Sequence, residues 1–514
     1  MKQNILGFAT LVAVALLSAT PQPMQAQRTT DKLDRGLVAV PSGNGSFVSW
    51  RIFGEEYYDT EYNLYRDGEL IAGPLSVSNY TDAAGKSGSK YQVAAVVRGV
   101  EQSKSDEVTR LSQQYIQFAV KDVYSRSGAN ITGDYTINDI ALADVDGDGV
   151  SEFIMKRNYV DGSSVDATAF NLIECYNIKG DRLWYIDLGP NMVSGPDEQY
   201  DAVGYDWDGD GKAEILMRGA DNMIIYHSDG TTTNIGNMNV NTRNTVLQTA
   251  NMTYTNTGAE YLLYLDGATG KPYEIGSGST PYWMTYPLPR GAADDWGDGY
   301  GHRSTKHYFG APFLDGRHPF IFLGRGCYTR HMMKAYSVDP DTHKLSLYWS
   351  WEDNNGWSSP YYGQGYHNFG IADVDWDGRD EICFGSMVID DNGKGLSTTG
   401  LGHGDAQHCS DFDPYRHGQE IFACNEDQPA MNFRNATTSQ IYYRLESGSD
   451  DGRALCGNFS NDYPGAMGHS SQSATISCVA DKPIAGGPGG FTNNFRIYWD
   501  GDLLEEGLDG ASRS

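Results

Sequence analysis

Three short acidic segments with the same spacing repeat along the chain. DVDGDGVSE (144–152), DWDGDGKAE (206–214) and DVDWDGRDE (373–381) carry Asp at positions one, three and five, Gly at position six and Glu at position nine. Carboxylates that alternate around a sharp glycine turn supply the oxygen ligands that Ca²⁺ prefers. We therefore expect three calcium sites. Their predicted ligands are Asp144, Asp146, Asp148, Glu152, Asp206, Asp208, Asp210, Glu214, Asp373, Asp375, Asp377 and Glu381.

The three acidic loops are predicted to join strands rather than helices. An EF-hand places a bidentate Glu at position twelve between two helices, whereas position twelve here is Met155, Met217 or Phe384 within an apolar run. Solvated turns are the alternative, since Asp and Gly are common in turns, but three copies with the same acidic positions favour metal. The repetition points to structural calcium rather than a catalytic centre. A degenerate copy, DFDPYRHGQEIF (411–422), keeps the first two aspartates.

A group of basic side chains stands out in a chain whose net charge is −29 at neutral pH. Residues 302–334 contain ten basic or imidazole side chains, with Asp315 as the only acid. Because apolar strands alternate with these residues, several are predicted to point to one side of a sheet and form an anion-binding face. Scattered solvated charges are the alternative. The predicted substrate-binding residues are Arg303, Arg325, Arg330 and, from a later segment, His403.

Glycine-rich segments around the third acidic loop carry further imidazoles. His367 lies in GQGYHNFG, and His403 and His408 lie in GLGHGDAQH, where the backbone can approach a ligand closely. Imidazole acts as a base near neutral pH or as a metal ligand, although a lone histidine is more often structural. An adjoining segment is dense in aromatic residues that either stack on sugar rings or pack in the core. These are Trp351, Trp357, Tyr361, Tyr362 and Tyr366.

The elements that position these residues are predicted to be strands. Residues 1–26 combine a basic start, an apolar run and a small-residue site, which predicts a signal peptide and a secreted or periplasmic bacterial protein. No later stretch is long and apolar enough to span a membrane. Residues 27–115 show short alternating segments separated by turn residues, typical of a fibronectin type III-like β-sandwich. From 116 to 514, strand-length apolar runs recur between turns, which favours a β-propeller.

Several segments resemble, in their order along the chain, the blocks of the family 11 polysaccharide lyases, the bacterial rhamnogalacturonan lyases. They are DVDGDGVSEFIMK, YDWDGDGKAEILMR, RGAADDWGDGYGHR, FIFLGRGCYTR, GQGYHNFGIADVDWDGRDEI, STTGLGHGDAQHCSDFDP and NFRIYWDGDLLEE. The resemblance implies an all-β chain with an eight-bladed, calcium-bound propeller. It also implies a secreted enzyme that cleaves the backbone of rhamnogalacturonan I, an acidic plant cell-wall polysaccharide, by calcium-assisted β-elimination at galacturonate. We expect a monomer, and the negative net charge argues against a nucleic-acid partner.

The resemblance also implies roles for individual residues. His331 and His367 match positions that bind an active-site calcium, and Arg453 in DDGRAL matches a position that binds the uronate carboxylate. Arg453 and His408 are the predicted catalytic residues, with His408 as proton acceptor. Family members continue beyond the Trp-Asp-Gly-Asp block to an Asn-Gly-Thr-Lys segment whose lysine is a candidate base, so we expect a propeller truncated at its C-terminus. Further candidates for the site are Asn138 and Asn158.

Two other functions stay open. A calcium-dependent propeller that only binds carbohydrate or protein would explain the acidic loops, but not the basic segment. A pectin-backbone hydrolase would need a pair of carboxyl groups as acid and base, and the 67 acidic residues of the chain leave room for such a pair.

Overall fold

The computed structural model describes residues 28–29, 33–54, 56–159, 168–192, 202–242, 246–249, 252–255, 257–297, 302–353, 355–472, 474–485, 495–499 and 501–508. Strands and turns dominate this part of the chain, which confirms the all-β prediction. Short 3-10 helices occur at Thr132–Asp134, Ala293–Trp296, His302–Thr305 and Gly356–Ser358. Among these residues, no helix has the length and apolar character needed to cross a membrane. The predicted signal peptide, residues 1–26, lies outside the described residues.

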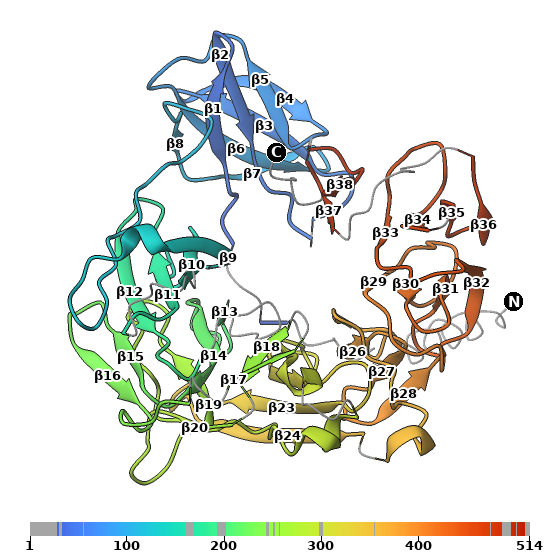
Figure 1. Cartoon of the computed structure of the whole chain (residues 1–514). Helices are drawn as coiled ribbons and strands as arrows, with labels where there is room; N and C mark the ends of the chain where they lie inside the picture. The colour runs from blue at the N-terminus through green and yellow to red at the C-terminus, as the bar shows by residue number, and fades with distance from the viewer. Residues whose placement is uncertain are drawn as a thin grey trace, which may run out of the picture.

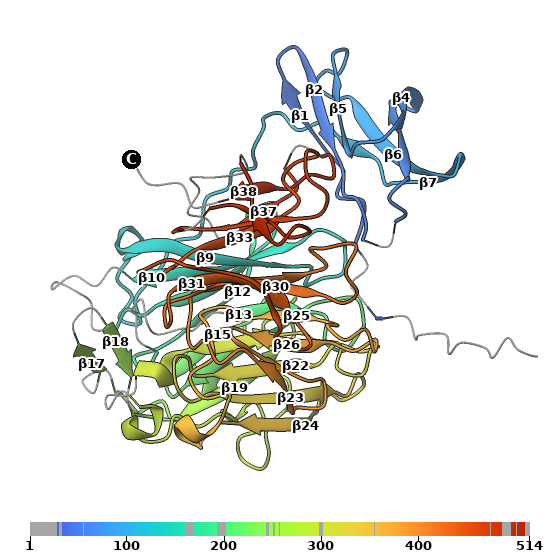
Figure 2. The ribbon, with the colours of Figure 1, turned by 90° about the vertical axis from the view of Figure 1, so that its right-hand side faces the viewer.

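The N-terminal unit consists of two antiparallel sheets around one core. One sheet has the order β1-β2-β5 (Val38–Ser42, Gly45–Ser49, Asn79–Asp82). The other has the order β4-β3-β6-β7 (Glu69–Leu75, Glu61–Arg66, Lys90–Val97, Val100–Lys104), with β8 (Val108–Thr109) beside β6. Alternate residues point inward, so Val48 of β2 is buried with Tyr62, Leu64 and Val93 of the second sheet. Figure 2 shows this unit projecting to one side of the remaining sheets.

The next part of the chain forms two sheets. Their strand orders are β16-β15-β12-β11-β10-β9 and β13-β14-β19-β20. The strands are β9 (Tyr135–Ala143), β10 (Glu152–Tyr159), β11 (Leu172–Tyr176), β12 (Arg182–Asp187), β13 (Ala202–Tyr205), β14 (Glu214–Ala220), β15 (Met223–Tyr226), β16 (Thr232–Ile235), β19 (Glu260–Leu265) and β20 (Met284–Thr285). A separate hairpin consists of β17 (Val246–Thr249) and β18 (Met252–Thr255).

Four described sheets of four strands follow, each with its strands in chain order. They are β21–β24 (His307–Gly310, Ile321–Arg325, Met332–Val338, Leu345–Glu352), β25–β28 (Gly370–Ala372, Glu381–Phe384, Met387–Ile389, Gly395–Thr398), β29–β32 (Ala406–Ser410, Glu420–Asn425, Ala430–Asn435, Ile441–Glu446) and β33–β36 (Ala454–Gly457, Met467–Ser470, Ile476–Ser477, Lys482–Pro483). A two-stranded ribbon of β37 (Phe495–Ile497) and β38 (Glu506–Leu508) comes last.

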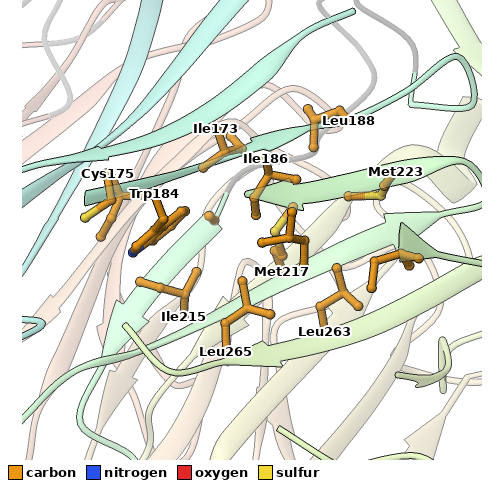
Figure 3. Close-up of a cluster of buried hydrophobic side chains, with 14 of the residues drawn as sticks. Ile173, Cys175, Trp184, Ile186, Leu188, Ile215, Met217, Met223, Leu263 and Leu265 are labelled. Carbon is orange, nitrogen blue, oxygen red and sulfur yellow. The ribbon is translucent and has the colours of Figure 1, made fainter. Parts of the chain in front are cut away.

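Central strands of these sheets are buried on both faces, because the sheets stack on one another. In β14, Ile215 and Met217 face the first sheet, whereas Leu216 between them faces the sheet that begins with β21. In β30, Ile421 packs toward the preceding sheet and Phe422 toward the following one. Figure 3 shows the first of these cores, where side chains of the first two sheets meet. Burial on both faces explains why such strands are continuous apolar runs in the sequence.

The stacked sheets follow one another along an arc, from β9–β12 to β33–β36 (Figure 1). First strands of neighbouring sheets contact each other, as β9 does with β13, β25 with β29, and β29 with β33. Because adjacent strands are antiparallel, the start of each first strand and the end of each second strand lie at the same end of the stack. The turns between first and second strands lie at the opposite end, and the acidic loops occupy those turns.

Candidate functional site

Five polar side chains from successive sheets gather at the end of the stack opposite the acidic loops. Asp405 immediately precedes β29, and Glu426 immediately follows β30. His367 lies shortly before β25, and Tyr328 shortly after β22. We call Tyr328, His367, His403, Asp405 and Glu426 the histidine cluster. Pairing of β29 with β30, and the stacking of three neighbouring sheets, bring these residues together from distant parts of the sequence.

His403 is the buried centre of the histidine cluster. It is 1% exposed, and its ring stacks on Tyr328 with the centroids 3.7 Å apart. Its Nδ1 donates a hydrogen bond of 2.6 Å to the carbonyl oxygen of Gly365, so the lone pair is on Nε2. That Nε2 lacks a hydrogen-bond partner among the described residues and lies 3.5 Å from Glu426 Oε2 and 4.0 Å from Asp405 Oδ1.

The charges of the histidine cluster are unbalanced toward the negative. Burial lowers the pKa of His403 to about 4, so its ring is neutral at pH 7. Burial, together with the charges of Asp450 and Glu426, raises the pKa of Asp405 to about 6. Burial also raises the pKa of Glu426. An imidazole lone pair thus faces two carboxyl groups that oppose each other's ionisation. A cation between the three groups would bind the lone pair and stabilise both ionised carboxylates.

The geometry of these three groups fits a divalent cation. One ligand atom from each of His403, Asp405 and Glu426 lies within 4.8 Å of the other two. Carboxylate oxygens are preferred ligands of Ca²⁺, and a metal-bound imidazole commonly donates its other N–H to a backbone carbonyl, as His403 does to Gly365. Glycine is needed at that position, because a Cβ on Gly365 would lie 2.4 Å from His331 Nε2.

His367 and Tyr328 form the open side of the histidine cluster. Tyr328 Oη lies 2.8 Å from His367 Nε2, which is 3.4 Å from Asp405 Oδ1. The His367 side chain is 33% exposed, so solvent reaches the cluster here. The Arg303 guanidinium lies 3.6 Å from the centre of the Tyr328 ring, and the charge of exposed Arg453 favours ionised Asp405. Two arginines therefore flank an accessible group of potential cation ligands.

His331, a predicted calcium ligand, lies beneath the histidine cluster. It is fully buried against Phe384, with the ring centroids 5.4 Å apart. Burial lowers the pKa of its ring to about 3. The set of ligand atoms that the geometry favours contains His403, predicted to bind substrate, together with Asp405 and Glu426. His367 lies at its side.

Three other predicted residues take part in contacts between strands. His408 Nε2 donates a hydrogen bond of 2.9 Å to the carbonyl oxygen of Ala454, which joins β29 to β33. Burial lowers the pKa of His408 to about 4. This bond leaves the lone pair on Nδ1, but a ring with a pKa of about 4 is a weak base, so we do not assign His408 the role of proton acceptor. Asn158 of β10 donates a hydrogen bond of 3.2 Å to Asn138 of the neighbouring strand β9.

The basic segment is divided between the two ends of the stack. Residues 317–318 lie before β22, whereas Arg325 is the last residue of that strand. Residues 317–318 and Arg325 therefore lie at opposite ends of the stack. Arg330 pairs with Glu352. Of the three predicted substrate-binding arginines, Arg303 is the one that contacts the histidine cluster.

Arg325 belongs instead to a buried ionic network around Glu260. The Glu260 carboxylate accepts hydrogen bonds from Arg325 at 2.7 Å, Arg290 at 2.8 Å and Arg218 at 3.2 Å. Burial alone would raise the pKa of Glu260, but these guanidinium groups lower it to about 2. The network joins β14, β19 and β22, which belong to two neighbouring sheets. Arg325 is thus a structural residue, and we do not assign it to substrate.

Replacing Glu260 with Gln is expected to lower the free energy of unfolding by about 3–5 kcal/mol, because buried guanidinium groups lose their counter-charge. In the wild type, the low pKa contributes stability that is fully present above pH 4.5 and is lost as the pH falls through about 2. The variant should lack this acid dependence. Urea unfolding at neutral and acidic pH measures both effects. The exposed Glu446→Gln change is the matched control, and equal unfolding midpoints for the two variants would contradict the account.

The three acidic loops share one geometry at the other end of the stack. In each loop, the Glu at position nine accepts a hydrogen bond from the backbone N–H of Val145, Trp207 or Val374, at 3.0, 3.0 and 2.7 Å respectively. Asp148 and Asp377 each accept a hydrogen bond from the backbone two residues on. Potential ligand atoms lie within 4.8 Å of one another in three sets: Asp144, Asp146 and Glu152; Asp206, Asp208, Asp210 and Glu214; Asp373, Asp375 and Glu381.

The buried glutamates of these loops have raised pKa values. Burial is the main cause, and the aspartates of the same loop add to it. The pKa rises to about 7 for Glu152 and to about 9 for Glu214 and Glu381. A bound cation would offset this repulsion, so the loops fit calcium by the chemistry of their ligand atoms.

The degenerate fourth loop contains its own cation. Arg416 lies 3.2 Å from Asp413 in the loop and 2.8 Å from Asp481. Glu420 comes one residue later than the glutamate of the other loops, but it still accepts hydrogen bonds from the backbone N–H groups of Phe412 and Asp413. The Arg416 guanidinium thus neutralises the acidic loop that lacks the third aspartate. In the other three loops, a metal ion would take this role.

Sequence reasoning missed three members of the histidine cluster: Tyr328, Asp405 and Glu426. Asp405 lies two residues after His403, so a signal for it was present within GLGHGDAQH. Tyr328 and Glu426 each follow an apolar strand, in FIFLGRGCYTR and QEIFACNE. Nothing in these local patterns says that the two strand ends meet, because they belong to different sheets.

Comparisons with known proteins agree on one family. The family model described as rhamnogalacturonan lyase family 11, C-terminal domain, matches residues 116–513, and that of the rhamnogalacturonan I lyases β-sheet domain matches residues 28–111. The chain is similar to rhamnogalacturonan endolyase YesW of Bacillus subtilis, with 39% identity over 99% of this chain and 80% of the relative. Rhamnogalacturonan exolyase YesX of the same organism is 36% identical, over 94% and 78%. The crystal structure of YesW matches with a TM-score of 0.79, over 94% of this chain and 80% of that one.

Proposed function

The chain belongs to rhamnogalacturonan lyase family 11, and on that premise we propose that it cleaves the backbone of rhamnogalacturonan I by calcium-assisted β-elimination at galacturonate. Membership and near full-length similarity to an endolyase and an exolyase make it a rhamnogalacturonan lyase. The observation that carries the proposed site is the buried, unbonded Nε2 of His403, which faces Asp405 and Glu426.

In the proposed mechanism, arginines bind the uronate carboxylate. Arg303 lies over Tyr328 on one side of the histidine cluster, and Arg453 lies near Asp405. A base takes the proton from C5 of galacturonate, the bond between C4 and its glycosidic oxygen breaks, and a double bond forms between C4 and C5. Negative charge moves toward the uronate carboxylate as the proton leaves, so fixed positive charges beside that carboxylate stabilise the transition state. His403, Asp405 and Glu426, with His367 beside them, would hold the calcium. Calcium would supply a further positive charge that acidifies the C5 proton.

The neutral state of His403 is part of this proposal. Its Nδ1 is held by Gly365 and its ring by Tyr328, so Nε2 stays directed at the two carboxyl groups. A pKa of about 4 keeps this nitrogen unprotonated over the neutral pH range. The ring therefore acts as a fixed ligand rather than as a competing positive charge.

We also propose the finer architecture that the sequence predicts. Consecutive four-stranded sheets that meet through their first strands support a β-propeller, for which the resemblance implies eight blades. The two-sheet N-terminal unit supports a fibronectin type III-like sandwich over residues 27–115, followed by a propeller over 116–514. Calcium in the three acidic loops, and a signal peptide at 1–26 that directs secretion or periplasmic export, complete the proposal.

The proposed reaction has a direct test. Incubation of the protein with rhamnogalacturonan I and calcium should raise the ultraviolet absorbance of the unsaturated uronate while the polymer becomes shorter. Homogalacturonan, which lacks rhamnose, is the matched control and should give no rise. Shortening without absorbance would reject elimination in favour of hydrolysis. No shortening of either polymer would reject the enzymatic proposal in favour of binding alone.

A further inference from the structure

The aromatic segment 351–366 separates into a packed part and an exposed part. Tyr366 is fully buried, and Trp351 and Tyr361 pack against the core between two sheets. Trp357 differs, because 76% of its surface is exposed to solvent. Of the two interpretations that the sequence leaves open, core packing therefore applies to most of these residues but not to Trp357.

The exposed indole of Trp357 is held in place by its neighbours. Its ring meets that of Tyr362 edge to face, with the centroids 4.9 Å apart. One edge of the indole lies against Gly363, where a Cβ would be 2.9 Å from a ring carbon. Gly363 has a φ of +79°, which favours glycine, and its N–H donates to the carbonyl oxygen of Thr329. The ring is thus pre-ordered although most of it faces water, which lowers the entropic cost of binding a ligand.

A short backbone segment connects this tryptophan to the histidine cluster. Gly363, which touches Trp357, also lies close to the carbonyl oxygen of Tyr328. Two residues later, the carbonyl oxygen of Gly365 accepts the hydrogen bond that orients His403. Between them, Gln364 Oε1 accepts a hydrogen bond from the backbone of Gly402. The indole and the cluster are therefore positioned by the same four residues, 362–365, at the same end of the stack.

We propose that Trp357 is a sugar-stacking platform of the substrate site, on which a pyranose ring of the bound backbone lies with its C–H face against the indole. The inference rests on the proposed function, because it takes the polymer to be the ligand. An ordered aromatic ring beside a charged site is suited to this role, since it offers a large apolar face with little loss of side-chain freedom. The uronate carboxylate binds to the arginines, whereas a neighbouring sugar ring of the same polysaccharide binds to Trp357.

Replacing Trp357 with Ala should raise KM for rhamnogalacturonan oligosaccharides about 3- to 10-fold, the range that an aromatic contact of ordinary strength gives. The value of kcat should not change, because the contact is made equally in the ground and transition states. Trp357→Phe should restore most of the affinity. Trp499→Ala is the matched control, because that side chain is 75% exposed and lies two residues after the end of β37. An unchanged KM for Trp357→Ala, or a loss confined to kcat, would overturn the proposal.

A second measurement does not depend on cleavage. In an Asp405→Asn background, the intrinsic tryptophan fluorescence should change when oligosaccharide is added, and Trp357→Ala in that background should remove the change while Trp499→Ala keeps it. If the wild type cleaves nothing but this pattern appears, the stacking platform stands and the proposed reaction fails. If the fluorescence change is absent, or persists without Trp357, the platform is rejected whatever the activity.

Discussion

The Asp405→Asn variant is expected to lose about 100- to 1000-fold in kcat/KM on rhamnogalacturonan, the size of effect that follows when a preorganised electrostatic group is removed from an active site. Asn keeps the size of the side chain but removes the negative charge that holds a cation beside His403 and Glu426. Because Asp405 has a raised pKa in the absence of a cation, the fold should tolerate the change. Initial rates of unsaturated product formation, measured at several calcium concentrations, give the result.

Two comparisons make this test specific. Asp462→Asn alters an exposed carboxylate in the turn between β33 and β34, and it should keep wild-type activity. In a calcium-free buffer, the melting temperature of Asp405→Asn should match that of the wild type, because neither protein then has an ion at the histidine cluster. If Asp405→Asn retained more than about a tenth of the wild-type kcat/KM, the loss would fall well below the expected electrostatic contribution, and the cluster would not be the active site.

Removal of calcium is expected to cause the largest loss of stability. A site filled at 100 times its Kd contributes about 2.7 kcal/mol to the free energy of unfolding, and three acidic loops are predicted to be filled. Without the ions, buried Glu214 and Glu381 face the aspartates of their own loops. A chelator should therefore lower the melting temperature, and excess calcium should restore it. Differential scanning calorimetry measures the shift.

The degenerate fourth loop provides an internal control. Arg416 neutralises Asp413 there, so Asp411→Asn should leave the response to the chelator unchanged. Asp206→Asn, by contrast, removes an acid that bonds the backbone of Gly209 and Gly211, and it should lower both the melting temperature and the part of the response that comes from its loop. A melting temperature that is the same with and without chelator would reject structural calcium.

The strands could be predicted because a strand that is buried on both faces is a continuous apolar run in the sequence. Ile215, Leu216 and Met217 are all apolar, since each faces one of two neighbouring sheets. The acidic loops could also be located, because all their ligands come from one short segment. The ligands of an acidic loop are close in the sequence, and a strand that is buried on both faces is apolar along its length, so local sequence is enough to find both.

The histidine cluster could be predicted only in part. His367 and His403 were found because their glycine-rich segments are unusual, but Asp405 and Glu426 belong to the site through the pairing of β29 with β30. The role of the arginines in the basic segment could not be predicted for a related reason. Arg325 and Arg303 look alike in the sequence, yet Glu260, distant along the chain, binds Arg325 in the core. Ion pairs between sheets cannot be read from local spacing.

Product analysis in water enriched in ¹⁸O tests the central claim most directly. Elimination breaks the bond between C4 of galacturonate and its oxygen without consuming water, whereas hydrolysis adds one oxygen atom from water to each pair of ends. The account predicts unsaturated products that absorb in the ultraviolet and contain no ¹⁸O from the cleavage step. Saturated products that carry one ¹⁸O for each cleaved bond would contradict it.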